Sequence, residues 1–301
     1  GDIWIGTAVG VDRLNGNRIR AVQDLGRTKG PKSIVRDRRG DLWLGARGVF
    51  RCRGHECQQF LEGDRSFFAL AVDSTGHLWA SRSRPQYEAV SAPPERSLYR
   101  FEEDGFALIA QDVSLAGVGG EGAVWVNQYE GSELPDGDDL HSTRSLGLDS
   151  LYSDLFSGVF EDSGGTLWIY GFLDGLWQHN DGRTERFTSM DGSPGDNVNH
   201  VMEDRRGHLW FAFWGHGVTV YDGLVSQSLT DVDGLPHNAV QMSFEDRDGA
   251  IWIATEGGAV RYRPGTDPPG VSMRGVTTDH QLGPVSYAEM PTTQAEIRFD
   301  Y

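Results

Sequence analysis

The sequence predicts an all-β protein, a seven-bladed β-propeller with four-stranded antiparallel blades, and three observations lead to this fold. Seven of the nine tryptophans recur at intervals of 36 to 46 residues. An aliphatic residue directly precedes each of them, and a glycine lies three positions before it. Glycine makes up 40 of the 301 residues, which indicates a chain rich in turns. A Gly- and Trp-marked period of about 40 to 50 residues is typical of propeller blades. The periodic tryptophans are Trp4, Trp43, Trp79, Trp125, Trp168, Trp210 and Trp252.

Each repeat also contains the signals of a hairpin. An aspartate lies six residues before the tryptophan in five repeats, at Asp37, Asp73, Asp162, Asp204 and Asp246, and Gly119 replaces it in the fourth repeat. Asp-x-x-Gly suits a tight turn, because Asp accepts backbone N–H groups and Gly adopts a positive φ. We expect this turn to join the first two strands of a blade. The apolar run around each tryptophan fits a strand buried on both faces, so we expect the indoles to pack between neighbouring blades.

Composition excludes two classes of partner. The formal charge is −17 and the isoelectric point is near 4.8. Affinity for phosphate comes mainly from clustered Lys and Arg, so we expect no nucleic acid and no anionic membrane surface as a partner. The sequence has no apolar run of about 18 residues, and we expect no membrane contact by this segment. It begins with neither a signal peptide nor a methionine, which suggests a segment of a longer protein.

Residues 233–262 resemble the two-component regulator propeller repeat. The stretch reads as a Gly-Leu-Pro-x-Asn lead, an apolar strand ending in Glu-Asp, and then Ile-Trp-Ile and Val-Arg-Tyr. The resemblance extends over about residues 1–263 and is strongest in repeats one, two, five, six and seven. It implies a sensor or input domain of a two-component-type signalling protein, in the periplasmic or extracellular part of a membrane-anchored receptor. It further implies that this chain is not itself an enzyme, needs no cofactor, and forms a homodimer in the full receptor.

The tail departs from the repeat. Pro264–Pro269 breaks the pattern, and the segments 271–274 and 296–301 read as two strands. They resemble the opening of the triple-tyrosine, immunoglobulin-like domain that follows such propellers. We therefore predict a propeller at 1–263, a linker at 264–270, and the truncated start of a β-sandwich domain at 271–301. The first repeat begins at its second strand and no outer strand is evident for the seventh, which leaves open whether the ring closes.

The loops between strands two and three open on one face of a propeller, and insertions there build binding sites on a rigid ring. Residues 81–96 and 127–141 are such insertions in two adjacent repeats. We expect this rim to bind a small molecule, an oligosaccharide or a partner chain, with Trp214 stacking on a sugar or flat ligand. The alternatives are that Trp214 seals the mouth of the ring and that the charged residues are solvated. The candidate ligand-binding residues are Arg47, Arg82, Tyr129, Phe172, Asp174, Trp214, His216, His237 and Glu256.

Two other functions remain open. His200, His216 and His237, with Glu256, would serve as acid–base groups or metal ligands if they met in one pocket. Related repeats build the streptogramin lyases, so a lyase-type enzyme is the alternative that this convergence would favour. No spacing motif supports either role, and we assign no catalytic or metal-binding residue. A structural dimerisation module is the third possibility.

Cys52 and Cys57 flank a predicted hairpin turn between the third and fourth strands of the second blade. Cross-strand neighbours meet the geometry of a disulfide, and exported proteins commonly carry such bridges. We therefore predict a disulfide between them.

Overall fold

The computed structural model describes residues 3–7, 10–15, 18–21, 31, 33–54, 56–62, 67–83, 96–128, 132–136, 139–147, 156–171, 175–188, 193–263, 275–277 and 298–300. The chain divides into two compact units, Gly1–Tyr262 and Arg263–Tyr301. Among the described residues, helix is confined to single 3-10 turns such as Thr143–Leu146, and none is long and apolar enough to cross a lipid bilayer.

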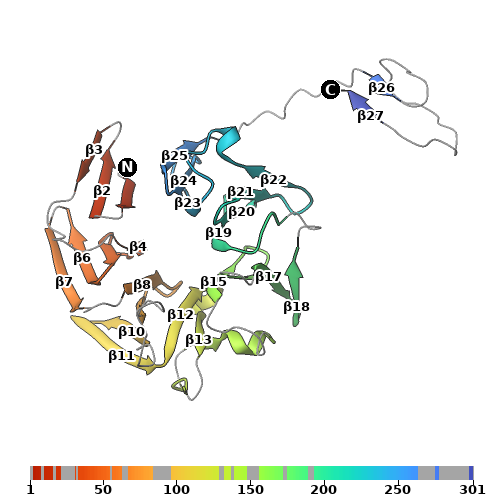
Figure 1. The fold of residues 1–301 in the computed structure, drawn as a ribbon. Coiled ribbons are helices and arrows are strands. Elements are labelled where there is room, and N and C mark those ends of the chain that lie inside the picture. Colours follow the sequence, from red (N-terminus) through yellow and green to blue (C-terminus); the bar gives the residue numbers. More distant parts are fainter. Residues whose placement is uncertain are drawn as a thin grey trace, which may run out of the picture. The chain divides into compact units, whose positions relative to one another are not determined.

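The first unit is a seven-bladed β-propeller. Figure 1 shows its blades following one another around a common centre, from the first in red to the seventh in blue. Blade 1 comprises β1 (Ile3–Thr7), β2 (Gly10–Asn15) and β3 (Arg18–Ala21), and blade 2 comprises β4 (Ser33–Arg36), β5 (Leu42–Gly45), β6 (Gly48–Arg53) and β7 (Glu56–Glu62). Blade 3 comprises β8 (Phe67–Val72), β9 (Leu78–Ser83), β10 (Ser97–Glu102) and β11 (Gly105–Gln111), and blade 4 comprises β12 (Val113–Val118), β13 (Val124–Gln128) and β14 (Leu140–Ser142). Blade 5 comprises β15 (Phe156–Glu161), β16 (Leu167–Gly171), β17 (Gly175–Asn180) and β18 (Arg183–Phe187). Blade 6 comprises β19 (Val198–Glu203), β20 (Leu209–Phe213), β21 (Gly217–Tyr221) and β22 (Ser226–Leu229), and blade 7 comprises β23 (Val240–Glu245), β24 (Ile251–Thr255) and β25 (Gly258–Tyr262).

The fourth blade departs from the predicted antiparallel pattern. Its strand β14 runs parallel to β13, with Val124 opposite Leu140 and Val126 opposite Ser142. A parallel neighbour requires a long return connection, whereas an antiparallel one needs only a short turn. The insertion after β13 provides that length. The insertion therefore begins at the rim predicted for the binding loops, where β13 ends. It returns to the opposite rim, where β13 and β14 both begin.

The apolar core lies between consecutive blades. Six clusters of buried residues occupy the six successive interfaces from blade 1 to blade 7. Strand β20 illustrates the arrangement, because Leu209 and Phe211 pack with blade 5 whereas Trp210 and Ala212 pack with blade 7. Successive strand side chains point to opposite faces, so a strand buried on both faces has no polar alternation. Five of the periodic indoles belong to the cluster shared with the following blade, which confirms that they pack between neighbouring blades. These are Trp43, Trp79, Trp125, Trp168 and Trp210.

The repeat aspartate holds both the turn and the indole. In five repeats its Oδ1 accepts the backbone N–H groups two and four residues later, as Asp204 does from Arg206 and His208. Its Oδ2 accepts the indole N–H six residues later at 2.8 to 3.1 Å. In the fourth repeat Gly119 supplies no carboxylate, and Trp125 Nε1 is buried with no hydrogen-bond partner among the described residues.

A second carboxylate links neighbouring blades. Glu161, Glu203 and Glu245 end the first strands of blades 5, 6 and 7. Each accepts a backbone N–H from the hairpin turn of the preceding blade, at 2.7 Å from Gly120, 2.6 Å from Ser163 and 2.9 Å from Arg205. The Glu-Asp pair of the repeat therefore fixes one blade to the next with its first residue and closes its own turn with its second.

In the second unit, the described residues form an antiparallel pair of strands, β26 (Gly275–Thr277) and β27 (Arg298–Asp300). The second of these falls within the predicted strand at 296–301, whereas the first follows the predicted segment 271–274. Segment 271–274 and the predicted linker 264–270 lie outside the described residues. The immunoglobulin-like identity of this unit remains a prediction.

Candidate functional site: the rim of the sixth and seventh blades

Backbone hydrogen bonds fix the rim between blades 6 and 7. The segment leading into β23 passes between the strand two–three loops of both blades. The carbonyl of Asn238 accepts the N–H groups of Gly215 and Gly217 from blade 6, and the carbonyl of Ala239 accepts the N–H of Glu256 from blade 7. Side chains on these loops therefore project from a rigid frame, which is the arrangement that a binding site needs.

Trp214 is the large aromatic residue of this rim. It lies between β20 and β21 and forms a backbone bridge with Ala239. Its backbone N–H donates to the carbonyl of Asn197 at 2.9 Å, which leaves the indole N–H out of this contact. The residue is 41% exposed, whereas Trp210 in the same blade is 1% exposed. The exposed indole is available to stack on a flat ligand.

Three further predicted residues accompany Trp214. His216, His237 and Glu256 are all exposed on the same two blades. The ring of His216 packs against Gly195, where a Cβ would lie 2.6 Å from its Cδ2 atom. The Nδ1 atom of His237 accepts the N–H of Ala239 at 2.9 Å, which leaves its Nε2 atom to donate to a ligand.

His200 does not belong to this group of exposed side chains. It lies within β19, opposite Ala212 of β20, and its Nδ1 atom is buried with no hydrogen-bond partner among the described residues. Burial lowers the pKa of His200 to about 4. The ring is therefore neutral at physiological pH, and its surroundings differ from those of His216 and His237. The part of the chain that the structure describes contains no group of three His, Cys, Asp or Glu side chains placed to hold a metal ion.

The other predicted residues lie elsewhere or cannot be placed. Arg47 follows β5 in blade 2 and Arg82 lies on β9 in blade 3, and both are half-buried. Phe68 connects these positions, because its N–H binds the carbonyl of Ala46 and its Cα is opposite Arg82. Arg47 and Arg82 thus both lie near the interface of blades 2 and 3. Tyr129, Phe172 and Asp174 lie outside the described residues.

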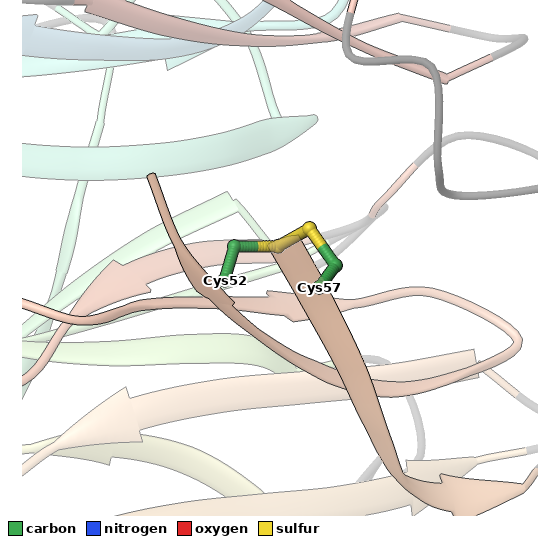
Figure 2. Close-up of a disulfide and its surroundings, with 2 residues drawn as sticks. All are labelled: Cys52 and Cys57. Carbon is green, nitrogen blue, oxygen red and sulfur yellow. A yellow bond between two sulfur atoms is a disulfide. The ribbon is translucent and has the colours of Figure 1, made fainter. Parts of the chain in front are cut away.

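Cys52 and Cys57 are joined by a disulfide, as Figure 2 shows. They are opposite each other on β6 and β7, with their Cα atoms 4.1 Å apart. Cys52 is buried in the cluster between blades 1 and 2, and Cys57 packs against that cluster. The bridge therefore holds the outer strand of blade 2 against its third strand.

The sequence analysis assigned no role to Asn238, which positions this site. Asn238 uses its Oδ1 and Nδ2 atoms to bind the N–H and carboxylate of Asp231, at 2.8 and 2.9 Å, while its carbonyl holds the loop of blade 6. The signal was present in the Gly-Leu-Pro-x-Asn lead. The final Asn of that lead orders the rim.

The comparisons with known proteins support the propeller repeat in this part of the chain. The family model described as the two component regulator propeller matches residues 192–215 and 234–257. These segments contain the leads into blades 6 and 7 and the strands that carry Trp210 and Trp252. A search of curated proteins found no significant match.

Solved structures share the fold. The extracellular domain assigned to a hybrid two-component system of B. thetaiotaomicron aligns with a TM-score of 0.65 and 16% identity, over 98% of this chain and 42% of that one. This chain thus spans about two-fifths of the length of that structure. YCF48 bound to D1 peptide aligns with a TM-score of 0.58 and 13% identity, over 89% of this chain and 90% of that one. Streptogramin B lyase aligns with a TM-score of 0.50 and 11% identity, over 86% and 88%.

Proposed function

We propose that this chain is an extracytoplasmic sensor domain of a two-component-type signalling protein, which binds a ligand or a partner chain on the rim of blades 6 and 7. The observation that carries the proposal is the exposed set of Trp214, His216, His237 and Glu256 on loops that backbone hydrogen bonds hold in place. The match to the two component regulator propeller, which covers the same two repeats, supports the signalling role.

The chemistry of the rim favours a neutral ligand rich in hydroxyl groups, such as an oligosaccharide. An indole face binds the apolar face of a sugar ring, and imidazole and carboxylate groups bind its hydroxyls. A non-enzymatic role fits this arrangement better than a lyase, since the Nδ1 atom of His200 is buried within β19 and His237 already uses its Nδ1 atom for a backbone hydrogen bond. The catalytic output would lie in another part of the protein.

Calorimetry tests the proposal directly. We expect a member of a panel of oligosaccharides and small metabolites to bind the 301-residue chain, and Trp214→Ala to weaken that binding at least about fivefold, because an aromatic contact of this kind contributes about 1–3 kcal/mol. Phe244→Ala is the matched control, because Phe244 is also an exposed aromatic residue, at 51%, on the sheet of blade 7.

Two results would contradict the ligand-binding role. One is the absence of binding heat across the panel together with a monomeric state in light scattering. The other is equal loss of affinity in Trp214→Ala and Phe244→Ala. A dimer that forms without any ligand would instead favour the structural dimerisation module, and the receptor homodimer is tested by the same light-scattering measurement.

A further inference from the structure

Four blades stack an arginine on their periodic tryptophan. The residue opposite the tryptophan on the third strand is Arg13 in blade 1, Arg51 in blade 2, Arg100 in blade 3 and Arg261 in blade 7. Their guanidinium carbons lie 5.3 to 5.8 Å from the centres of the indole rings. This is the distance of a cation–π contact.

A carboxylate from the same rim completes the arrangement. In blade 7, Asp246 Oδ2 accepts the indole N–H of Trp252 at 3.0 Å and also binds Arg261, at 3.0 Å from Nε and 2.7 Å from Nη2. In blade 2 the guanidinium of Arg51 pairs with Asp41. The propeller therefore contains a recurring position for a guanidinium, bounded by an indole and a carboxylate.

Blade 5 keeps the indole and the carboxylate but lacks the cation. Gln178 is opposite Trp168, and Asp162 Oδ2 accepts the indole N–H at 2.8 Å. Blade 6 also keeps the indole and the carboxylate and lacks the arginine, but there Val220 fills the position and packs against the apolar cluster shared with blade 7. Of these two blades, blade 5 is thus the one in which the residue opposite the indole is polar.

A cavity lies at this position, between blades 5 and 6. Its volume is about 380 Å³, and its lining includes Asp162, Trp168, Gln178, Glu203, Tyr221 and Asp222. Pockets for small ligands start at about 300 Å³. Among the described residues that line it, four are carboxylates and none is basic. Asp222 is exposed, and its Oδ1 is occupied by the N–H groups of Leu224 and Val225.

We infer that this cavity is a binding site for a small ligand with a guanidinium group, which takes the place of the arginine found in blades 1, 2, 3 and 7. The cation would lie beside Trp168 and pair with Asp162 and Asp222. The site lies among the turns that join strands one and two and strands three and four, and so on the rim opposite Trp214. It is therefore independent of the ligand proposed above.

The test compares two isosteric probes. We expect n-butylguanidine to bind the 301-residue chain, and n-butylurea, which has the same shape without the charge, to bind at least about tenfold more weakly, in line with a cation–π contact and an ion pair. Raising the salt concentration should weaken the guanidine alone. Saturation-transfer NMR and calorimetry measure the affinities of the two probes. Trp214→Ala should leave both affinities unchanged, because Trp214 lies on the other rim.

Substitution at Gln178 distinguishes binding of n-butylguanidine in this cavity from non-specific attraction of the cation to the acidic protein. Gln178→Arg supplies the internal guanidinium of the other blades and should abolish binding of n-butylguanidine, whereas Gln178→Ala leaves the cavity open and should retain it. Circular dichroism establishes that each variant folds. Asp222→Asn keeps the turn and should weaken binding several-fold if Gln178→Arg does not fold. Equal binding of the two probes, no binding of either, or unchanged binding in folded Gln178→Arg would overturn the inference.

Discussion

At the scale of single residues, the periodic tryptophans occupy equivalent positions in the repeat but differ in the hydrogen bonding of their indole N–H groups. Trp210 is 1% exposed and donates its indole N–H to Asp204 at 3.1 Å. Trp125 is 9% exposed, but its Nε1 atom has no partner among the described residues because Gly119 replaces the aspartate. A Cβ at Gly119 would lie 2.3 Å from Glu161 Oε2, so the carboxylate of the next blade occupies the space that a side chain would need.

We predict that Trp210→Phe destabilises the protein by about 1–3 kcal/mol more than Trp125→Phe. Both changes remove a similar amount of apolar ring, but only the first removes a hydrogen bond to a buried carboxylate, because Asp204 Oδ2 then keeps Arg206 alone as its side-chain donor. Urea denaturation of the two variants measures the difference. Equal losses of stability would mean that the hydrogen bond from the indole to the repeat aspartate contributes nothing.

His200 gives a pH dependence with a defined sign. Burial lowers its pKa to about 4 in the folded protein, against an ordinary value of 6.5. As the pH falls, the unfolded chain takes up the proton first, so the stability associated with the neutral ring is complete above about pH 6.5 and is lost progressively towards pH 4. The loss is bounded at roughly 3 kcal/mol.

Replacing His200 with Gln should flatten the dependence of the unfolding free energy on pH between 6.5 and 4.5. His216→Gln is the matched control, because that ring is exposed in the folded protein. Chemical denaturation at several pH values in this range measures the slope for each variant. A slope that His216→Gln changes as much as His200→Gln would assign the effect to another group.

At the scale of elements, strand pairing in blade 2 is reinforced by the disulfide between β6 and β7. The bridge closes a loop with a sequence separation of only 5 residues. Loop-closure entropy for so short a loop is about 2 kcal/mol, at the lower end of what disulfides contribute.

We therefore expect the double variant Cys52→Ala, Cys57→Ala to lose about 2 kcal/mol of stability and to keep its propeller fold. Dithiothreitol should destabilise the natural protein by a similar amount and leave the double variant unaffected. Thermal denaturation with and without the reductant distinguishes the two. A fully unfolded double variant would show that blade 2 cannot form its outer strand pair without the bridge.

The elements also show what the sequence can predict. The spacing of tryptophan and glycine is local and repeats in every blade, and the aspartate repeats in five of them, so this pattern predicts the blades and the hairpin turns. The direction of β14 depends on where a long insertion returns, which no local pattern encodes. His200 was grouped with His216 and His237 by its place near the lead, although it lies inside a first strand, between Asn199 and Val201, and not in a loop of the rim. Trp214 was predicted correctly as a residue of the rim, but its role in binding remains a prediction.

At the scale of the whole molecule, each interface between blades acts as one unit of the core. In a repeat protein, stability is approximately a sum of the repeats and their nearest-neighbour interfaces. One face of blade 7 differs from the equivalent face in the other blades. Met242 and Phe244, opposite Ala254 and Trp252 in β24, are 45% and 51% exposed. Met202, at the position in blade 6 that corresponds to Phe244, is 8% exposed because blade 7 covers it.

The same substitution in these two blades should therefore have very different costs. Met202→Ala removes a side chain from the closed interface of blades 6 and 7 and should cost about 2–5 kcal/mol, as large-to-small changes in a core do. Met242→Ala removes a side chain that is nearly half exposed and should cost less than about 1 kcal/mol. Urea denaturation of both variants at the same protein concentration measures the two costs. A cost for Met242→Ala as large as that for Met202→Ala, and independent of concentration, would mean that the face of Trp252 is covered within a single molecule, and that the ring closes more tightly than its exposed side chains indicate.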